Sequence, residues 1–144
     1  MPPLIPGVTS TTAALTAERT RLDVIAQNVA NANTTRSLDG LPYRRQQVAF
    51  ETILDAARTT AGGDVQLGGP RVSKIRPDPR PFPSIHEPGH PDAHPVTGQL
   101  LLPNVSVHEE MADMIAASRT FDANLAVFRT ARQMTMQALT LGKR

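Results

Sequence analysis

SVHEEMADMIAASRTFDANLAVFRTARQMTMQALTL, residues 106–141, decides the fold, because it contains neither glycine nor proline. At about 1.5 Å per residue, this stretch predicts a helix of roughly 54 Å. Ser106 and Glu109 have the spacing of a capping box at its start, and acidic residues in the first turns suit the helix dipole. Gly142 follows as a residue that can end the helix in a left-handed conformation.

The C-terminal helix carries apolar residues on more than one face. A second line lies opposite the main face and consists of Val127, Met134 and Leu141, while Arg132 interrupts the main face. A long helix that is apolar on two sides requires more than one packing partner. At about 100° per residue, the main face contains Val107, Met111, Met114, Ser118, Phe121, Leu125, Phe128, Met136 and Leu139.

A second helix is predicted near the N-terminus, from about Val8 to Asn31. Leu15, Leu22 and Val29 stand seven residues apart, and Ile25 flanks this line. The spacing is heptad-like, although an ordinary amphipathic helix in a small bundle would show the same pattern. We expect residues 1–7, which contain three prolines and a glycine, to be loose. Asparagines at 28, 31 and 33 suit a polar helix end.

Composition narrows the classes of function. The 144 residues include 3% aromatics and no cysteine, so a private core would be small, and disulfides and thiolate metal sites are excluded. The formal net charge is +2, without a stripe of bases interleaved with aromatics, which argues against nucleic-acid binding. No apolar run suits a membrane span, and the N-terminus lacks the regions of a secretory signal, so we expect no membrane insertion.

The middle of the chain predicts short strands and loops. The pattern at Gln46–Phe50 predicts a strand, and residues 52–58 suit a helical turn. Residues 65–67 and 72–75 suit two short strands, which would form a possible hairpin around Gly68-Gly69-Pro70. Prolines between 77 and 95 should forbid regular structure, before a last strand at 100–102. The predicted fold is therefore mainly α, with two long helices packing as a coiled-coil-like pair around a small irregular β insert. The expected segments are 1–36, 37–103 and 104–144.

His86, His90 and His94 are spaced four apart, which on a helix would form a metal face. Pro88, Gly89 and Pro91 exclude that helix, so we expect a solvated loop with no metal or cofactor. We also find no nucleophile elbow, phosphate loop or catalytic carboxylate pair, and Glu109 and Glu110 suit helix capping. The sequence therefore predicts a protein that is not an enzyme.

The chain resembles the flagellar basal-body rod protein C family, within the flagellar axial proteins. The matching sequences are LTAERTRLDVIAQNVANANTTRSLDGLPYRRQQVAF at 15–50, EPGHPDA at 87–93 and PNVSVHEEMADMIAASRTFDANLAVFRTARQM at 103–134. Two positions depart from the family pattern, Gln27 in place of Asn and His94 in place of an acidic run. Neither departure disturbs the predicted helices.

The resemblance implies a structural subunit of the proximal rod that transmits torque, with other rod proteins and copies of itself as partners. It also implies export through the flagellar type III apparatus without a cleaved signal peptide, to a periplasmic rod. A non-polymerising two-helix adaptor and a metal-binding protein at the histidine loop are the alternatives. The residues expected at subunit interfaces are Leu15, Leu22, Ile25, Asn28, Val29, Asn31, Asn33, Met111, Met114, Phe121, Leu125, Val127, Phe128, Met134 and Leu141.

Overall fold

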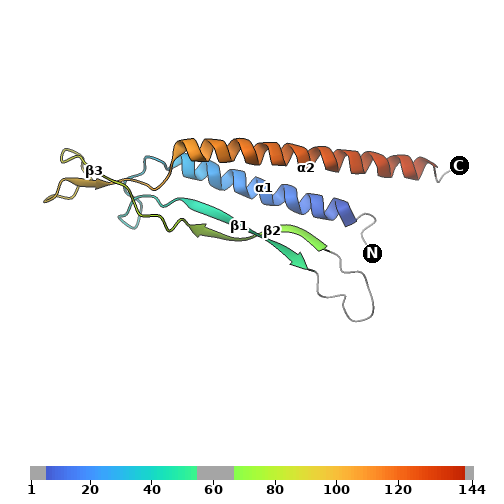
Figure 1. Cartoon of the computed structure of the whole chain (residues 1–144), viewed down its shortest axis with the longest axis horizontal. Coiled ribbons are helices and arrows are strands. Elements are labelled where there is room, and N and C mark those ends of the chain that lie inside the picture. The colour runs from blue at the N-terminus through green and yellow to red at the C-terminus, as the bar shows by residue number, and fades with distance from the viewer. Residues whose placement is uncertain (1–5, 55–66, 142–144) are drawn as a thin grey trace.

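The molecule is a long, layered structure in which one helix lies between a longer helix and a β-hairpin (Figure 1). The structure, a computed structural model, describes residues 6–54 and 67–141. This architecture confirms the predicted class of two terminal helices with a small β region between them, and the strands of that region are antiparallel. The elements, in chain order, are α1 (Pro6–Ala30), β1 (Gln46–Leu54), β2 (Leu67–Pro77), β3 (Ser84–His86), β4 (Gln99–Leu101) and α2 (Val107–Leu141).

The two helices run antiparallel, side by side, along the length of α1. Near the end of α1, the Asn28 side chain donates to the carboxylate of Glu110 in the first turn of α2, at 3.0 Å. In total α1 has 25 residues and α2 has 35, so α2 is roughly 15 Å longer. The last turns of α2 therefore extend beyond the start of α1 (Figure 1).

Both helix starts differ in detail from the prediction. α1 begins at Pro6, inside the segment expected to be loose, because proline suits the first helical turn, where its missing N–H is not needed. At the start of α2, the backbone N–H of Glu109 lies 3.5 Å from the Ser106 hydroxyl, but the Glu109 side chain pairs with Arg80. Only one arm of the capping box is therefore present. Gly142 lies outside the described residues.

The middle of the chain forms one long antiparallel hairpin from β1 and β2. β1 continues to Leu54, so residues 52–54 are strand, and the predicted helical turn is wrong there; the rest of it lies outside the described residues. Leu67 to Pro77 is a single strand paired with β1, and the predicted hairpin around Gly68-Gly69-Pro70 is also wrong. Residue 65 is not described.

The glycine at position 69, within strand β2, is required by a close contact with α1. A Cβ atom built at position 69 would lie 2.6 Å from the backbone oxygen of Ser10, 2.8 Å from its Cα and 2.9 Å from the Cβ of Ala13. The strand backbone thus lies directly against α1, which requires a residue without a side chain. This close approach seats the hairpin on the helix.

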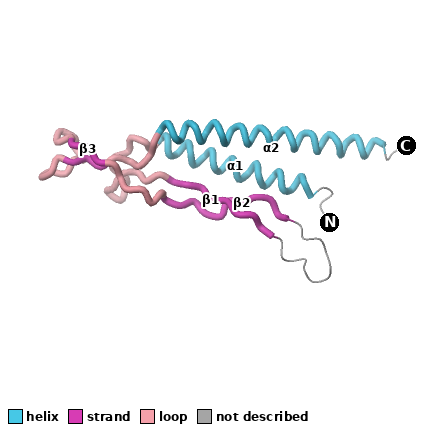
Figure 2. The backbone as a smooth tube through the Cα atoms, viewed as in Figure 1, coloured by secondary structure: helices cyan, strands magenta, loops and turns pink. Residues whose placement is uncertain are grey.

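The proline-rich segment holds more structure than predicted. β3 lies within it, because Ser84–His86 contains no proline and can pair with β4. The predicted last strand is confirmed as β4, one residue earlier than expected. Gly98 has a φ of 63° and lies under the ring of His86, where a Cβ would be 2.8 Å from Cε1. Figure 2 shows that β3 and most loops gather at the end of the molecule opposite the start of α1 and the end of α2.

Few side chains are buried among the residues that the structure describes. The covered side of α2 is rotated from the predicted apolar face. Val107, Met111, Met136 and Leu139 of that face are exposed. Ala117, at 0% exposure, lies on the covered side instead, because a small residue permits close approach of α1. The covered line alternates in steps of four and three residues through Glu110, Met114, Ala117, Phe121, Asn124, Phe128, Ala131 and Thr135.

A side chain at position 69 should separate the hairpin from α1. We expect Gly69→Val to lower the free energy of unfolding by about 1–3 kcal/mol, because overpacking forces backbone atoms to move. Urea unfolding followed by circular dichroism measures this change. Gly89→Val is the matched control, since a Cβ at Gly89 meets nothing within 4 Å. Equal stability of the two variants would show that the hairpin is not seated through Gly69.

Candidate functional site

A buried polar junction lies where the end of α1, the start of β1 and the start of α2 meet. Its members, called the polar junction below, are Asn28, Arg45, Asp78, Asn104 and Glu110. Glu110 is 0% exposed, and Asn28 and Asp78 are each 1% exposed. Buried charges persist in proteins only when they are paired and hydrogen-bonded, so each partner in this cluster matters.

Asn28 connects all three elements through four hydrogen bonds. Its Nδ2 donates to the backbone oxygen of Gln46 at 2.9 Å and to Glu110 Oε2 at 3.0 Å. Its Oδ1 accepts from the Tyr43 hydroxyl at 3.0 Å and from the Gln46 N–H at 2.9 Å. Both donors and both acceptor positions of the amide are therefore used. The expectation that Asn28 simply closes the helix as a polar end is wrong.

Arg45 immediately precedes β1 and connects the hairpin to α2. Its Nε donates to Glu110 Oε1, and its Nη2 donates to Asp113 Oδ2 at 3.2 Å. Its Nη1 donates to Asp78 at 3.4 Å. Its backbone N–H donates to Asn104 Oδ1 at 2.8 Å. One guanidinium thus pairs with three carboxylates from two other parts of the chain.

Asp78 and Asn104 complete the junction from the proline-rich side. Asp78 accepts from the backbone and the Nε of Arg80, both at 2.9 Å, and from Gln47 Nε2 at 2.9 Å. The backbone N–H of Asp78 donates to the oxygen of Arg45 at 2.8 Å. Asn104 Nδ2 donates to the oxygen of Arg80 at 3.0 Å. The irregular segment after β2 is therefore held by specific bonds.

Several pKa values are shifted in the junction. Burial alone would lower the pKa of Arg45, but the hydrogen bond and charge of Glu110 raise it above the ordinary value. Burial alone would raise the pKa of Asp78, but hydrogen bonds from Arg80 and its charge lower it below 3.8. Burial raises the pKa of Tyr43, and the charge of Glu110 adds to this effect. These directions favour the charged forms of Arg45 and Asp78 and the neutral form of Tyr43.

Sequence reasoning missed most of this junction. Glu110 was expected to cap the helix, although it continues the four–three spacing of Met114, Ala117 and Phe121 toward the helix start. That spacing was the available signal, but a glutamate is not expected at a covered position. Nothing in the local sequence identified Asp78 as buried or Arg45 as its largely covered partner.

The expected interface residues of α1 have mixed exposure in the single chain. Ile25 is 5% exposed and, like Asn28, is buried. Asn33 is exposed, and the side chain of Asn31 donates to the backbone oxygen of Gln27 at 2.8 Å. The remaining expected residues, which are half-buried, are Leu15, Leu22, Val29 and Asn31.

The expected interface residues of α2 divide into two groups. The group that is half-buried comprises Met114, Phe121, Leu125 and Phe128. The other group is exposed, with exposed fractions of 54% for Met111, 57% for Val127, 59% for Met134 and 73% for Leu141. α1 is the only helix or strand that packs on α2 within the described part of the chain. The second group therefore projects away from the subunit's own packing.

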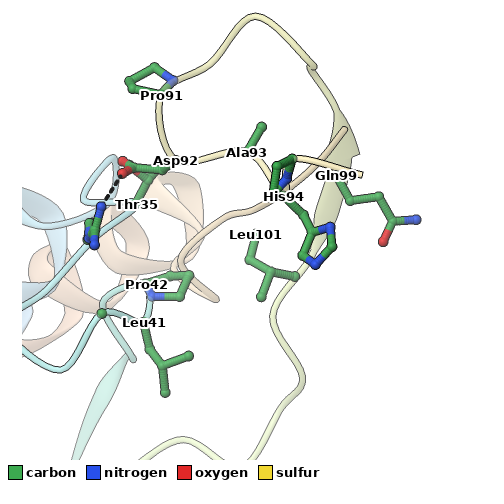
Figure 3. A pocket seen from close by; sticks show the side chains of 12 residues that line it. Thr35, Leu41, Pro42, Pro91, Asp92, Ala93, His94, Gln99 and Leu101 are labelled. Carbon is green, nitrogen blue, oxygen red and sulfur yellow. Dashed lines mark hydrogen bonds and ion pairs between the residues drawn. The ribbon is translucent and has the colours of Figure 1, made fainter. Parts of the chain in front are cut away.

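A separate hollow of about 350 Å³ lies between the segment after α1 and the loop before β4. Figure 3 shows Asp92 turned toward Thr35, whose hydroxyl donates to it at 2.8 Å; Arg36 pairs with the same carboxylate at 3.5 Å. His94, which also lines the hollow, accepts at Nδ1 from the N–H of Val96 at 3.3 Å. These contacts hold the loop in place.

The histidine loop does not assemble a metal site among residues 6–54 and 67–141, where no group of three or more His, Asp or Glu side chains is arranged to hold an ion. His90 Nδ1 instead accepts from the N–H of Asp92 at 3.1 Å. Within the same described ranges, neither helix combines the length and apolar character that a membrane span requires. The arrangement as a whole holds elements together and presents helix surfaces.

Two family models match the ends of the chain. Residues 11–36 match the model described as flagella basal body rod protein. Residues 96–141 match the model described as flagellar basal body rod FlgEFG protein C-terminal. The matched ranges include the polar-junction residues Asn28, Asn104 and Glu110.

Curated relatives match almost the whole chain. A flagellar basal-body rod protein FlgC from Yersinia enterocolitica is 39% identical over 130 residues, covering 90% of this chain and 91% of the relative. The protein of that name from Borreliella burgdorferi is 39% identical over 136 residues, covering 88% and 90%. The one from Bacillus subtilis is 36% identical over 141 residues, covering 90% and 92%.

Removing the Arg45 guanidinium from the polar junction should destabilise the fold strongly. We expect Arg45→Met to lower the free energy of unfolding by about 3–5 kcal/mol, because Glu110 would remain buried without its charge partner. Urea unfolding followed by circular dichroism tests this. The control is Arg19→Met on the exposed side of α1, which should change stability by about 0.5 kcal/mol or less. A loss for Arg45→Met as small as that of the control would contradict a stabilising junction.

The junction should weaken in acid. Asp78 has a folded-state pKa below the ordinary 3.8, so its contribution to stability is complete above that pH and is lost as pH falls through the folded value. Urea titrations of the wild type and Asp78→Asn at a series of pH values measure the difference in their unfolding free energies. We expect that difference to stay constant near neutrality and to shrink only below about pH 3.8. Shrinkage already between about pH 7 and pH 5 would contradict the assignment.

Proposed function

The chain belongs to the flagellar basal-body rod protein C (FlgC) family, and we propose that its two terminal helices make the contacts that build the rod. It is a structural subunit of the flagellar basal-body rod and not an enzyme, and other rod components are its partners. The alternatives of a non-polymerising adaptor and of a metal-binding protein find no support among its relatives.

The observation that carries this proposal is the set of apolar side chains that the subunit leaves uncovered on α2. Val127, Met134 and Leu141 are each more than half exposed, on the side away from the covered line. Burying apolar surface contributes about 25 cal/mol per Å², so neighbouring helices that cover these side chains would stabilise an assembly. We propose copies of this chain and other rod proteins as those neighbours.

The helix pair itself suits a coiled-coil-like arrangement. The covered line of α2 repeats in steps of four and three residues, which is the spacing of the two inward positions of a heptad. On α1, Leu15, Leu22 and Val29 repeat every seven residues and are half-buried. The half-buried state leaves part of each side chain available to a neighbouring subunit. Residues 1–36 and 104–144 would form the helical part of the subunit, and residues 37–103 the insert.

The polar junction gives this subunit a mechanical role. Because Arg45 and Asn28 bond both helices to the start of the hairpin, twisting one element relative to another would break charge-assisted hydrogen bonds. Such a joint would let the insert transmit force from the helical layer to surrounding components. We propose that the subunit transmits torque in the proximal part of the rod, after export by the flagellar type III apparatus.

A charge in the helix seam, the surface along which α1 packs on α2, should block assembly. Leu125 is half-buried, one turn from Phe121 and Phe128. We expect Leu125→Asp to abolish motility, because burying an unpaired carboxylate costs several kcal/mol and that cost recurs in every copy. Complementation of a strain lacking the protein, scored by swimming and by isolated basal bodies, measures the effect.

Asp122→Asn is the matched control for Leu125→Asp. Asp122 is exposed on the same stretch of α2 and forms no ion pair within the described residues, so its substitution should leave swimming close to normal. If stably produced Leu125→Asp protein restored normal rods and swimming, the helix seam would not be the assembly surface.

A further inference from the structure

A continuous chain of ion pairs crosses the subunit, and it contains more carboxylates than guanidinium groups. It begins at Glu18 and Arg21 on α1, continues to Asp113 at 3.7 Å from Arg21, and passes through Arg45 into the polar junction. Five carboxylates share three guanidinium groups. The chain consists of Glu18, Arg21, Asp113, Arg45, Glu110, Asp78, Arg80 and Glu109.

Because carboxylates outnumber guanidinium groups in this chain of ion pairs, the carboxylate of Glu18 at its end is incompletely paired. Glu18 Oε2 is buried and has no hydrogen-bond partner in the described part of the chain. Its nearest cation is Arg21 Nη1 at 3.9 Å, while the other terminal nitrogen of Arg21 is directed to Asp113. Arg21 is therefore divided between two carboxylates and satisfies neither at a short distance. A further cation at Asp113 would allow Arg21 to move closer to Glu18.

Asp113 and Arg21 both line a groove of about 380 Å³ between α1, β1 and the start of α2. Asp113 has a side chain that is 42% exposed, so it is accessible from solvent. The apolar part of the lining includes Ile25, Val48 and Phe50. The groove thus combines an accessible carboxylate with apolar walls, and an arginine flanked by apolar side chains suits it.

The C-terminal half of α2 carries arginines flanked by apolar side chains. Arg129, Arg132, Met136 and Leu139 follow one another in steps of three, four and three residues, so they share one face of the helix. We call these four residues the distal arginine face. Met136 and Leu139 are 59% and 61% exposed. Neither arginine forms an ion pair within residues 6–54 and 67–141.

We propose that the groove of one subunit receives the distal arginine face of a second copy of this chain. An arginine of the second copy would bind Asp113, freeing Arg21 for Glu18, while Met136 and Leu139 would contact the apolar walls. This inference rests on the proposed function and specifies one of its subunit contacts. A helix that docks apolar and charged residues in steps of three and four is a common mode of groove recognition.

The location of the two surfaces favours a second copy that continues the assembly. The groove lies near the start of α2, and the distal arginine face lies near its other end (Figure 1). A contact between two different surfaces of the same chain does not close on itself in a pair, and it propagates into rings or helical arrays. This is the kind of contact a rod requires.

Cross-linking tests the contact, because the chain has no natural cysteine to interfere. Full-length protein with Phe50→Cys in the groove is mixed with full-length protein carrying Met136→Cys, and a short thiol cross-linker is added. We expect the mixed dimer to form about tenfold more than with Gln137→Cys, the adjacent exposed position on another side of α2. Val48→Cys, which also lies in the groove lining, replaces Phe50→Cys if the latter alters the circular dichroism spectrum.

Charge reversal tests the role of the arginines. Adding Arg129→Glu and Arg132→Glu to the Met136→Cys protein should reduce the mixed dimer about tenfold. Arg119→Glu, on another face of α2, should leave it unchanged. Equal yields from positions 136 and 137, or insensitivity to the reversal at 129 and 132, would overturn the proposal.

Two further outcomes also decide the question. Predominant Met136→Cys homodimers would mean that the distal faces pair symmetrically, which overturns docking in the groove. No cross-linked dimer above the control, together with loss of swimming in Arg129→Glu/Arg132→Glu, would assign the face to a different rod protein and overturn the second copy as occupant. Normal rods with Leu125→Asp would instead count against the proposed function itself, so the two failures are distinguishable.

Discussion

The architecture depends on one buried carboxylate. Glu110 lies fully buried in the first turn of α2, where a charge without partners would oppose folding. Its two oxygens are held by Asn28 from α1 and by Arg45, immediately before β1. These partners come from distant parts of the chain, so the carboxylate is satisfied only when α1, the hairpin and α2 are in their observed register. The need to pair the buried charge of Glu110 therefore specifies how α1, the hairpin and α2 are aligned.

This dependence is greater because the apolar core of the subunit is small. The buried apolar residues in the described chain are Ala17, Val24, Ile25, Leu100 and Ala117. Two of the five are alanines, which contribute little area but permit close backbone approach. Polar pairing thus provides the specificity of the fold, while larger apolar side chains on α2 remain at the surface, where the proposed assembly would cover them. Such exposed apolar surface agrees with the proposal that neighbouring helices complete the burial of this subunit.

The hairpin and the helices form a connected unit through two different contacts. At one end, Arg45 and Asn28 bond the start of β1 to both helices. Farther along, the backbone of β2 lies against α1 at Gly69, where no side chain intervenes. Fixing a two-stranded ribbon at two separated points restricts its rotation about the helix. Such a ribbon is marginal alone, so its packing on α1 also stabilises it.

The sequence by itself determined the two long helices, the presence of a small β insert between them and the family. Stretches without glycine or proline predict helices directly, and the motifs at both ends identify the rod proteins. Tertiary structure alone decided the rotation of α2, the strand through Gly68-Gly69-Pro70 and the roles of Asn28, Arg45 and Glu110. Local patterns place large apolar residues inward, whereas the packed molecule buries Ala117 and Glu110. The reason is that close approach and charge compensation depend on partners brought together from distant positions in the chain, which spacing within one segment does not reveal.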